Sequence, residues 1–318
     1  MEINIPNKKK DIRQFSIKTD KKTKVLLEEI MKVIFFLCAL CAVFAVVSIT
    51  LYLVLNGMPP LFKIGFKKIL FETKWAPTAV EPKYGILYII LTSIIGTIFA
   101  VIIGVPVGVL TAIFIAEVAP KKIVSIVKPA VELLAGIPSV IYGLLGIMIL
   151  NPVMYKLELI IFKNSQSHQF TGGSNLLSAI IVLAIMILPT VINISESAIR
   201  MVPLEMKSAS LALGASKMQT IFKIVLPIAK SGIMSSIVLG VGRAIGEAMA
   251  ITLVSGSSVN IPLPFNSVRF LTTAIVAEMG YAADEHRQVL FTIGMILFLF
   301  IMFVNIVFTK LMKGVEKK

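Results

Sequence analysis

The chain has 318 residues, of which 57% are hydrophobic and 15% charged, and its formal net charge is +14. Its mean hydropathy of +0.93 exceeds what a soluble core of this length requires, so the composition indicates a membrane protein. The basic residues are spread over several loops and both tails, which gives little support to nucleic-acid binding.

The N-terminal segment, residues 1–32, is polar and basic, and we expect a cytoplasmic tail without fixed structure. The apolar run Val33–Leu55 that follows is longer than the apolar core of a signal peptide, which predicts an uncleaved membrane anchor. Cys38 and Cys41 form a C-x-x-C within this run. We interpret them as two small apolar residues on a helix rather than as a redox or metal site.

Six apolar runs are long enough to cross a bilayer, which takes about 20 residues. They are Val33–Leu55, Ile86–Ala116, Val131–Tyr155, Leu176–Glu196, Gly232–Ser255 and Val289–Thr309. Continuous apolar runs predict an all-α membrane protein with six transmembrane helices, because barrel strands would alternate in polarity. Gly104, Pro106 and Gly108 in the second run predict a bend, a strong tilt or a segment that leaves the bilayer.

The distribution of Lys and Arg predicts the orientation of these spans. Of the 31 basic residues, 21 lie in the two tails and the segments on the N-terminal side of the membrane, nine lie in the opposite loops, and Arg243 lies within a span. Cytoplasmic segments carry the excess of positive charge. We therefore expect both termini to be cytoplasmic.

The third run contains a predicted helix break. Glu132 lies at its cytoplasmic start, and Gly136 and Pro138 should interrupt the helix before Ser139 and Tyr142. The break either exposes backbone groups to a cavity or is a packing kink in which Ser139 bonds a freed carbonyl. The packing kink is the commoner of the two.

The polar segment 197–231, which we call the Gly214 loop, predicts a helix–turn–helix between two apolar runs. Pro203 stands where a helix can start, Gly214 allows a sharp turn, and a second helix should begin near Ser216 and end or bend at Pro227. Apolar residues on such a loop, which lipid cannot cover, suggest a docking surface for a soluble partner.

The fifth run contains Arg243 near its middle, and a central arginine costs about 2.5–3.5 kcal/mol on insertion scales. Glu247 lies one helical turn further on and could neutralise it. Gly242 and Gly246 form a small-x-x-x-small pair that would let a neighbouring helix approach. Either the ion pair is structural, or the guanidinium lies in a translocation path and suits a tetrahedral oxyanion such as phosphate.

The sequence offers no catalytic, cofactor or metal site. No glycine is followed by lysine, so the phosphate-binding G-x-x-x-x-G-K-[ST] loop is missing, and any ATP hydrolysis would come from another chain. His168 and His286 lie in different loops without cysteine partners, so we predict no metal site.

Two motifs resemble known transporters. The spacing from Gly214 to Ile224, Leu226 and Pro227 is similar to the EAA-x3-G-x9-I-x-LP loop of ABC-transporter permeases, which docks the ATPase. The EAA positions fall on Ser208, Ala209 and Ser210, so the family's glutamate is replaced.

The segments VELLAGIPSVIYGLLG (131–146), MILPTVINISESAIRMVP (186–203) and GRAIGEAMA (242–250) resemble the PstC type of phosphate ABC-transporter permease. The resemblance covers the chain from about Tyr84 to its end. It implies the type I ABC importer permease fold and a role for Arg243 and Glu247 in phosphate passage.

The apolar runs and the charge distribution predict a division of the chain, and the resemblance implies a set of partners. The expected parts are a tail (1–32), an anchor (33–55), an extracytoplasmic loop (56–85), a permease core (86–312) containing the loop 197–231, and a C-terminal tail (313–318). The expected partners are a PstA-like second permease, an ATPase dimer and an extracytoplasmic phosphate-binding protein in a bacterial or archaeal cell membrane. The alternatives are a permease for molybdate, sulfate or phosphonate, an ion-coupled secondary transporter, and a structural scaffold.

Overall fold

The computed structural model describes residues 21–165 and 168–316, so most of the predicted N-terminal tail lies outside the described residues. The chain divides into two compact units, Met1–Tyr52 and Leu53–Lys318. In the first unit, helix α1 (Lys21–Pro60) begins well before the predicted anchor, and its apolar side chains are exposed along its length. Cys38 and Cys41 are both exposed on α1 as free thiols.

The second unit is mostly helical. After α1 its helices are α2 (Phe66–Phe71), α3 (Leu87–Ile113), α4 (Lys121–Gly136), α5 (Ser139–Leu145), α6 (Asn151–Ile161), α7 (Leu176–Arg200), α8 (Leu204–Ala212), α9 (Lys217–Thr220), α10 (Leu226–Gly246), α11 (Met249–Val254), α12 (Leu271–Glu278) and α13 (Asp284–Glu316). Four π-helical turns adjoin them: η1 (Leu61–Gly65), η2 (Phe114–Val118), η3 (Gly146–Leu150) and η4 (Ile221–Val225). Two short strands, β1 (Trp75–Ala76) and β2 (Lys83–Tyr84), pair antiparallel in the segment predicted as the first outer loop.

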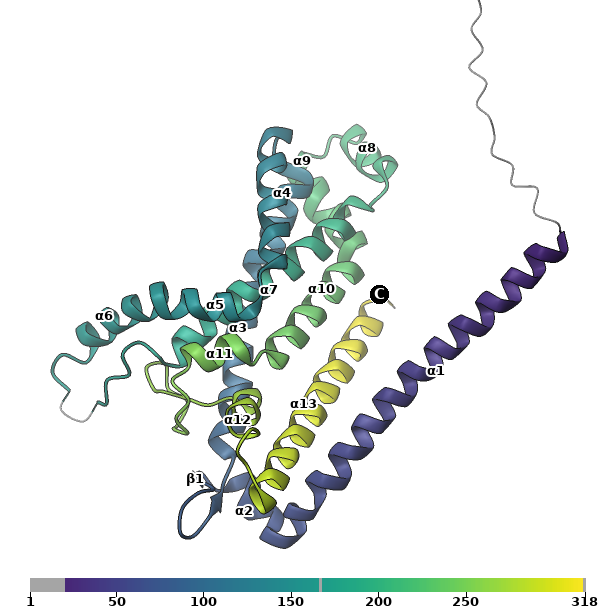
Figure 1. Cartoon of the computed structure of the whole chain (residues 1–318). Helices are drawn as coiled ribbons and strands as arrows, with labels where there is room; N and C mark the ends of the chain where they lie inside the picture. The colour runs from purple at the N-terminus through teal and green to yellow at the C-terminus, as the bar shows by residue number, and fades with distance from the viewer. Residues whose placement is uncertain (1–20, 166–167, 317–318) are drawn as a thin grey trace, which may run out of the picture. The chain divides into compact units, whose positions relative to one another are not determined.

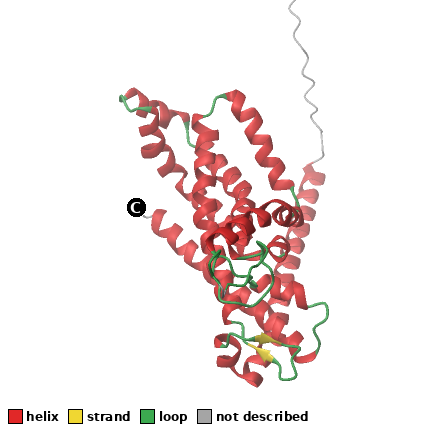
Figure 2. Cartoon of the chain, turned by 90° about the vertical axis from the view of Figure 1, so that its left-hand side faces the viewer, coloured by secondary structure: helices red, strands yellow, loops and turns green. Residues whose placement is uncertain are grey.

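Six helical segments among the described residues are long and apolar enough to cross a membrane, which confirms the predicted number of spans. They are Val25–Phe71, Leu87–Val118, Ser139–Ile161, Leu176–Arg200, Lys217–Gly246 and Asp284–Lys310. The third begins at Ser139 rather than at Val131, because residues 131–136 belong to α4. Figure 1 places α8 and α9 at one end of the second unit and β1 and α2 at the other, and Figure 2 shows the strands at that second end.

Helix α7 is the most buried of the six spans and carries the main core. α3 packs along it through two glycines: a Cβ on Gly104 would lie 2.7 Å from Ile187, and one on Gly108 would lie 2.8 Å from Val191. α3 also remains a single helix through Pro106. These glycines therefore allow close helix packing and do not interrupt the helix.

Candidate functional site

Two long helical stretches of the second unit are interrupted. α4 ends at Gly136, and the extended residues Ile137 and Pro138 lead into α5, as the sequence predicts. In the same way, α10 ends at Gly246, and the extended Glu247 leads toward α11. The predicted fifth span therefore contains a break, which the sequence analysis missed.

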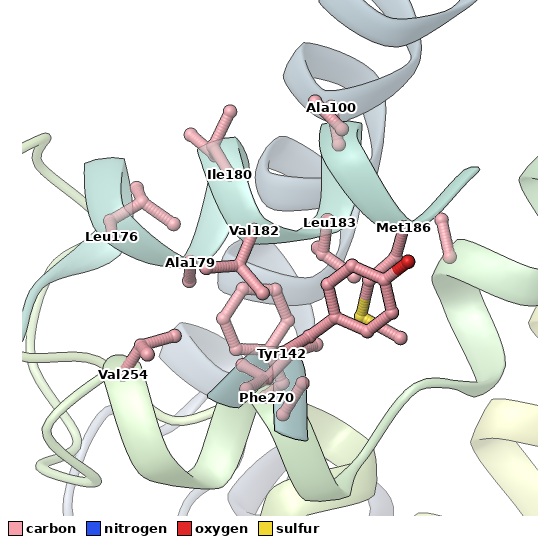
Figure 3. Packing of buried hydrophobic residues seen from close by; sticks show 14 of the residues in the cluster. Ala100, Tyr142, Leu176, Ala179, Ile180, Val182, Leu183, Met186, Val254 and Phe270 are labelled. Atoms are coloured by element: carbon pink, nitrogen blue, oxygen red, sulfur yellow. The ribbon is translucent and has the colours of Figure 1, made fainter. Parts of the chain in front are cut away.

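The halves that follow the two breaks pack against each other. A Cβ on Gly143 of α5 would lie 3.0 Å from the Cα of Ala250 in α11, so the two backbones are in close contact. Tyr142 of α5 is buried in the same core, against α7 beside Leu183 and Met186 (Figure 3). Residues around both breaks are thereby brought to one region of the protein.

Side chains satisfy the carbonyl groups that the breaks release. The Tyr142 hydroxyl donates to the Leu134 carbonyl across the first break at 2.7 Å. The Thr272 hydroxyl donates to the Glu247 carbonyl at the second break at 2.6 Å. Unpaired carbonyls would be costly away from water. The donor at the first break is thus Tyr142. The packing-kink interpretation had assigned this hydrogen bond to Ser139.

Arg243 lies in the last turn of α10, half-buried, and not in the middle of a continuous helix. Its Nη1 donates to the Thr190 hydroxyl at 3.4 Å. The predicted pairing with Glu247 is wrong, because the helix ends between the two residues. The Glu247 carboxylate instead accepts a hydrogen bond from the Ala250 amide at 3.0 Å.

The predicted role of Gly242 and Gly246 in helix approach is also wrong within this chain. A Cβ on either glycine would meet no atom within 4 Å. The close contact of α10 is made by Gly240, where a Cβ would lie 3.0 Å from Val191 on α7. The open space beside Gly242 leaves room next to Arg243.

Glu132 is exposed on α4 and lines a groove of about 630 Å³ beside the first break. The groove is formed by Pro129, Glu132, Leu133, Gly136, Ile137 and Pro138. Among the described residues, Glu132 forms no ion pair. The structure thus places Glu132 and Ser139 at the first helix break, and Arg243 and Glu247 at the second.

The Gly214 loop has the predicted helix–turn–helix. α8 starts after Pro203, Gly214 takes a left-handed φ of 85°, and Ser216 caps α9 in a capping box with Gln219. Of the two outcomes predicted at Pro227, a helix end or a bend, the end is wrong, because the helical segment continues through it from α9 to α10 by way of η4. A proline is tolerated near a helix start because its missing N–H is not needed there.

The residues aligned with the ABC-permease loop differ in exposure. Ser208, Ala209, Gly214 and Pro227 are exposed, whereas Ile224 and Leu226 are half-buried. Leu226 packs against the cluster that joins the ends of α3, α7 and η4. The four exposed residues are therefore available to a partner, whereas the half-buried Leu226 anchors the loop to the permease.

Ion pairs near the Gly214 loop are a feature that the sequence analysis missed. Lys207 on α8 pairs with Glu117 in η2 at 2.5 Å, and Glu196 on α7 pairs with both Arg200 and Lys128. Glu117 and Lys207 are 90 positions apart in the chain, and no motif marks such a pairing in advance.

A polar pocket of about 550 Å³ lies at the loops between α6 and α7 and between α11 and α12. It is lined by Tyr88, His168, Gln169, Phe170, Thr171, Ser258, Asn260, Ile261, Asn266 and Ser267. His168 bonds the fully buried Glu158 at 2.8 Å, so the structure gives this histidine a carboxylate partner. No cluster of three or more metal-ligating side chains occurs within the described part of the chain.

The second unit has interrupted helices near the Arg243 side chain and an exposed helical loop at one end. Together with six candidate spans, these features are typical of a membrane transport permease. The chain belongs to the family described as binding-protein-dependent transport system inner membrane components, which matches residues 104–317. It is accordingly a multi-pass permease component of an ABC importer.

Its relatives include the Probable ABC transporter permease protein YqgH of Bacillus subtilis, at 37% identity over 84% of this chain and 86% of the relative. The Phosphate transport system permease protein PstC of Xylella fastidiosa is 35% identical over 84% of this chain and 85% of that protein.

Solved transporters share the fold. A bacterial alginate ABC transporter in complex with an alginate-bound periplasmic protein aligns with a TM-score of 0.59 at 16% identity, covering 91% of this chain and 98% of that one. The MetNI methionine ABC transporter, in an inward-facing conformation, aligns with a TM-score of 0.51 at 20% identity, over 73% and 94%. These likenesses support the predicted type I ABC importer permease fold.

Proposed function

We propose that this chain forms the translocation pathway of an ATP-driven phosphate importer that works by alternating access. The proposal rests on the surroundings of the Arg243 side chain. Its guanidinium is half-buried within a predicted span, contacts the Thr190 hydroxyl and has no ion-pair partner among the described residues. A charge placed so deeply normally faces a protein interior or an aqueous cavity.

The chemistry of this region favours an oxyanion. A guanidinium that no carboxylate neutralises can bond two oxygens of a tetrahedral anion at once. The carbonyls at the end of α10 lie in the turn that contains Arg243, so the helix dipole stabilises the cation while no anion is bound. The resemblance of the chain to PstC proteins supports phosphate as that anion.

The exposed apolar side chains of the Gly214 loop favour an ATPase subunit as its partner. Leu204, Leu211 and Leu213 all point away from the protein, and Leu213 is 90% exposed. Exposed apolar side chains on one loop are typical of a docking surface for another protein. In this proposal a dimer of ATPases closes on ATP binding, and the loop passes that movement to the pathway.

The other proposed partners are a PstA-like permease and an extracytoplasmic phosphate-binding protein. The polar pocket around His168 and Asn260 is lined mainly by the loops between α6 and α7 and between α11 and α12, where such a binding protein would dock. The excess of Lys and Arg on the Gly214 loop side supports cytoplasmic termini and an extracytoplasmic pocket. For alternating access, ATP and phosphate each need only to bind one state of the transporter more tightly than the other state.

Uptake by the reconstituted complex tests this function. The complex purified through this chain, with its binding protein, should accumulate labelled phosphate in proteoliposomes when ATP is present on the ATPase side. Uptake should stop on ATP depletion even with a proton or sodium gradient maintained. Uptake that survives ATP depletion would establish an ion-coupled transporter. Displacement of phosphate by molybdate, sulfate or phosphonate at lower concentration would establish another oxyanion as substrate.

A further inference from the structure

α8 of the Gly214 loop is a helix without a hydrophobic attachment of its own, because none of its residues is buried. Within the loop it is held by the Ser210–Thr220 hydroxyl contact at 3.0 Å and by the Ala215 amide, which donates to the Ser210 carbonyl. These contacts fix α8 to α9. Because α9 continues through η4 into α10, they tie α8 to the helix that carries Arg243, but they do not connect it to α3.

The direct connection from α8 to the end of α3 is made by one ion pair. Lys207 Nζ lies 2.5 Å from Glu117 Oε1, and the two side chains are only 16% and 14% exposed. Within the described residues, this pair is the one ion pair or side-chain hydrogen bond between α8 and a helix outside the loop. Glu117 belongs to η2, the π-helical turn that directly continues α3.

A second set of charges lies beside η2. Arg200 donates to the Ile115 carbonyl of η2 at 3.4 Å and also pairs with Glu196. The other oxygen of Glu196 pairs with Lys128 of α4 at 3.2 Å, and that carboxylate is only 4% exposed. η2, the end of α7 and α4 are thus joined by charges at the end of the permease where α8 lies.

We propose that the Lys207–Glu117 pair is the latch through which movement of α8 reaches α3, with Glu196 of α7 extending the connection to α4. The proposal rests on the function proposed above. Separating a pair this deeply buried leaves two charges without partners, so the two residues move together. α3 follows as a rigid body because Gly104 and Gly108 pack it tightly on α7.

α4 offers a movable end to this connection. It packs on α7 through the small cluster of Val131, Ile192 and Ile115 and ends at the break after Gly136, where a Cβ would meet no atom within 4 Å. Beyond the break lies α5, whose Gly143 packs on Ala250 of α11, the helix that follows Arg243 and the second break. A tilt of α4 about residues 137–138 would change the surroundings of Arg243.

Charge reversal in the reconstituted complex tests the latch. We expect Lys207→Glu and Glu117→Lys alone each to lower the phosphate transported per ATP hydrolysed by roughly fivefold or more, the lower end of typical site-to-site couplings. The double variant K207E/E117K restores the pair in reverse and should return this ratio to within about twofold of the wild type. Lys32→Glu is the control, since Lys32 is an exposed residue of α1 outside the Gly214 loop.

The outcomes separate the latch from docking and from the substrate. Equal ratios in the wild type and both single variants overturn the latch, as does a double variant that stays as defective as the singles. Loss of ATPase copurification in the single variants also overturns it, because the pair would then serve docking. A wild-type complex that hydrolyses ATP without accumulating phosphate overturns the proposed substrate instead.

Discussion

At Gly143, α5 packs so closely on α11 that only the hydrogen atom of a glycine side chain fits between them. A Cβ there would lie 3.0 Å from the Ala250 Cα and 3.1 Å from its carbonyl oxygen, and backbone atoms cannot rotate away. This contact holds α5 and α11, the helices that follow the two breaks, in their positions. The geometry around Arg243 and Tyr142 therefore depends on a residue that cannot itself bind substrate.

We predict that Gly143→Val destabilises the purified complex by about 1–3 kcal/mol, the usual cost of overpacking a core. Gly242→Ala is the matched control, because it adds a methyl group in a helix where the structure has open space. Thermal unfolding in detergent measures both. A melting temperature for Gly143→Val equal to that of the control would show that the two halves do not pack this closely.

Glu247 and Glu196 illustrate how position decides the role of a membrane carboxylate. Glu247 follows the end of α10 and bonds the first turn of α11. Glu196 remains inside α7 and holds Arg200 and Lys128. Spacing of four residues predicts an ion pair only where the helix is continuous, which is why it holds for Glu196 and Arg200 and fails for Arg243 and Glu247.

Among the elements, α8 is the one best placed to contact a partner. It is bounded by Pro203 and the left-handed Gly214, and it presents exposed apolar residues on a loop held to the body by charges. An element of this kind can transmit force without belonging to the core.

We predict that Leu213→Glu reduces copurification of the ATPase with this chain, because it places a carboxylate on a 90% exposed apolar side chain of the docking surface. The chain itself should fold normally, since no core residue changes. Quantification of the ATPase retained on an affinity-tagged permease gives the measurement, with Lys32→Glu, outside the Gly214 loop, as control. Full retention and normal coupling would place the docking surface elsewhere.

For the molecule as a whole, the sequence predicted the features that depend on local pattern. Apolar length predicted six spans, and Pro203, Gly214 and Ser216 predicted the helix–turn–helix. Gly136 and Pro138 predicted the first helix break. Each of these depends on residues that are neighbours in the chain.

Features that depend on residues far apart in the chain were not predicted. The end of α10 at Gly246 has no proline to mark it, and the Glu247 carbonyl released there is bonded by Thr272 of α12. The Lys207–Glu117 pair likewise requires the full arrangement of α3 and α8. Tertiary contacts decide such features, and a single sequence carries no record of them.

The central claim is that Arg243 serves anion passage, and phosphate uptake by the Arg243→Gln complex tests it most directly. Loss of charge-assisted hydrogen bonds costs about 1.5–3 kcal/mol each, so uptake should fall by roughly ten- to a hundredfold. Binding of the ATPase and thermal stability should be unchanged. Wild-type uptake by a fully assembled Arg243→Gln complex would contradict the account.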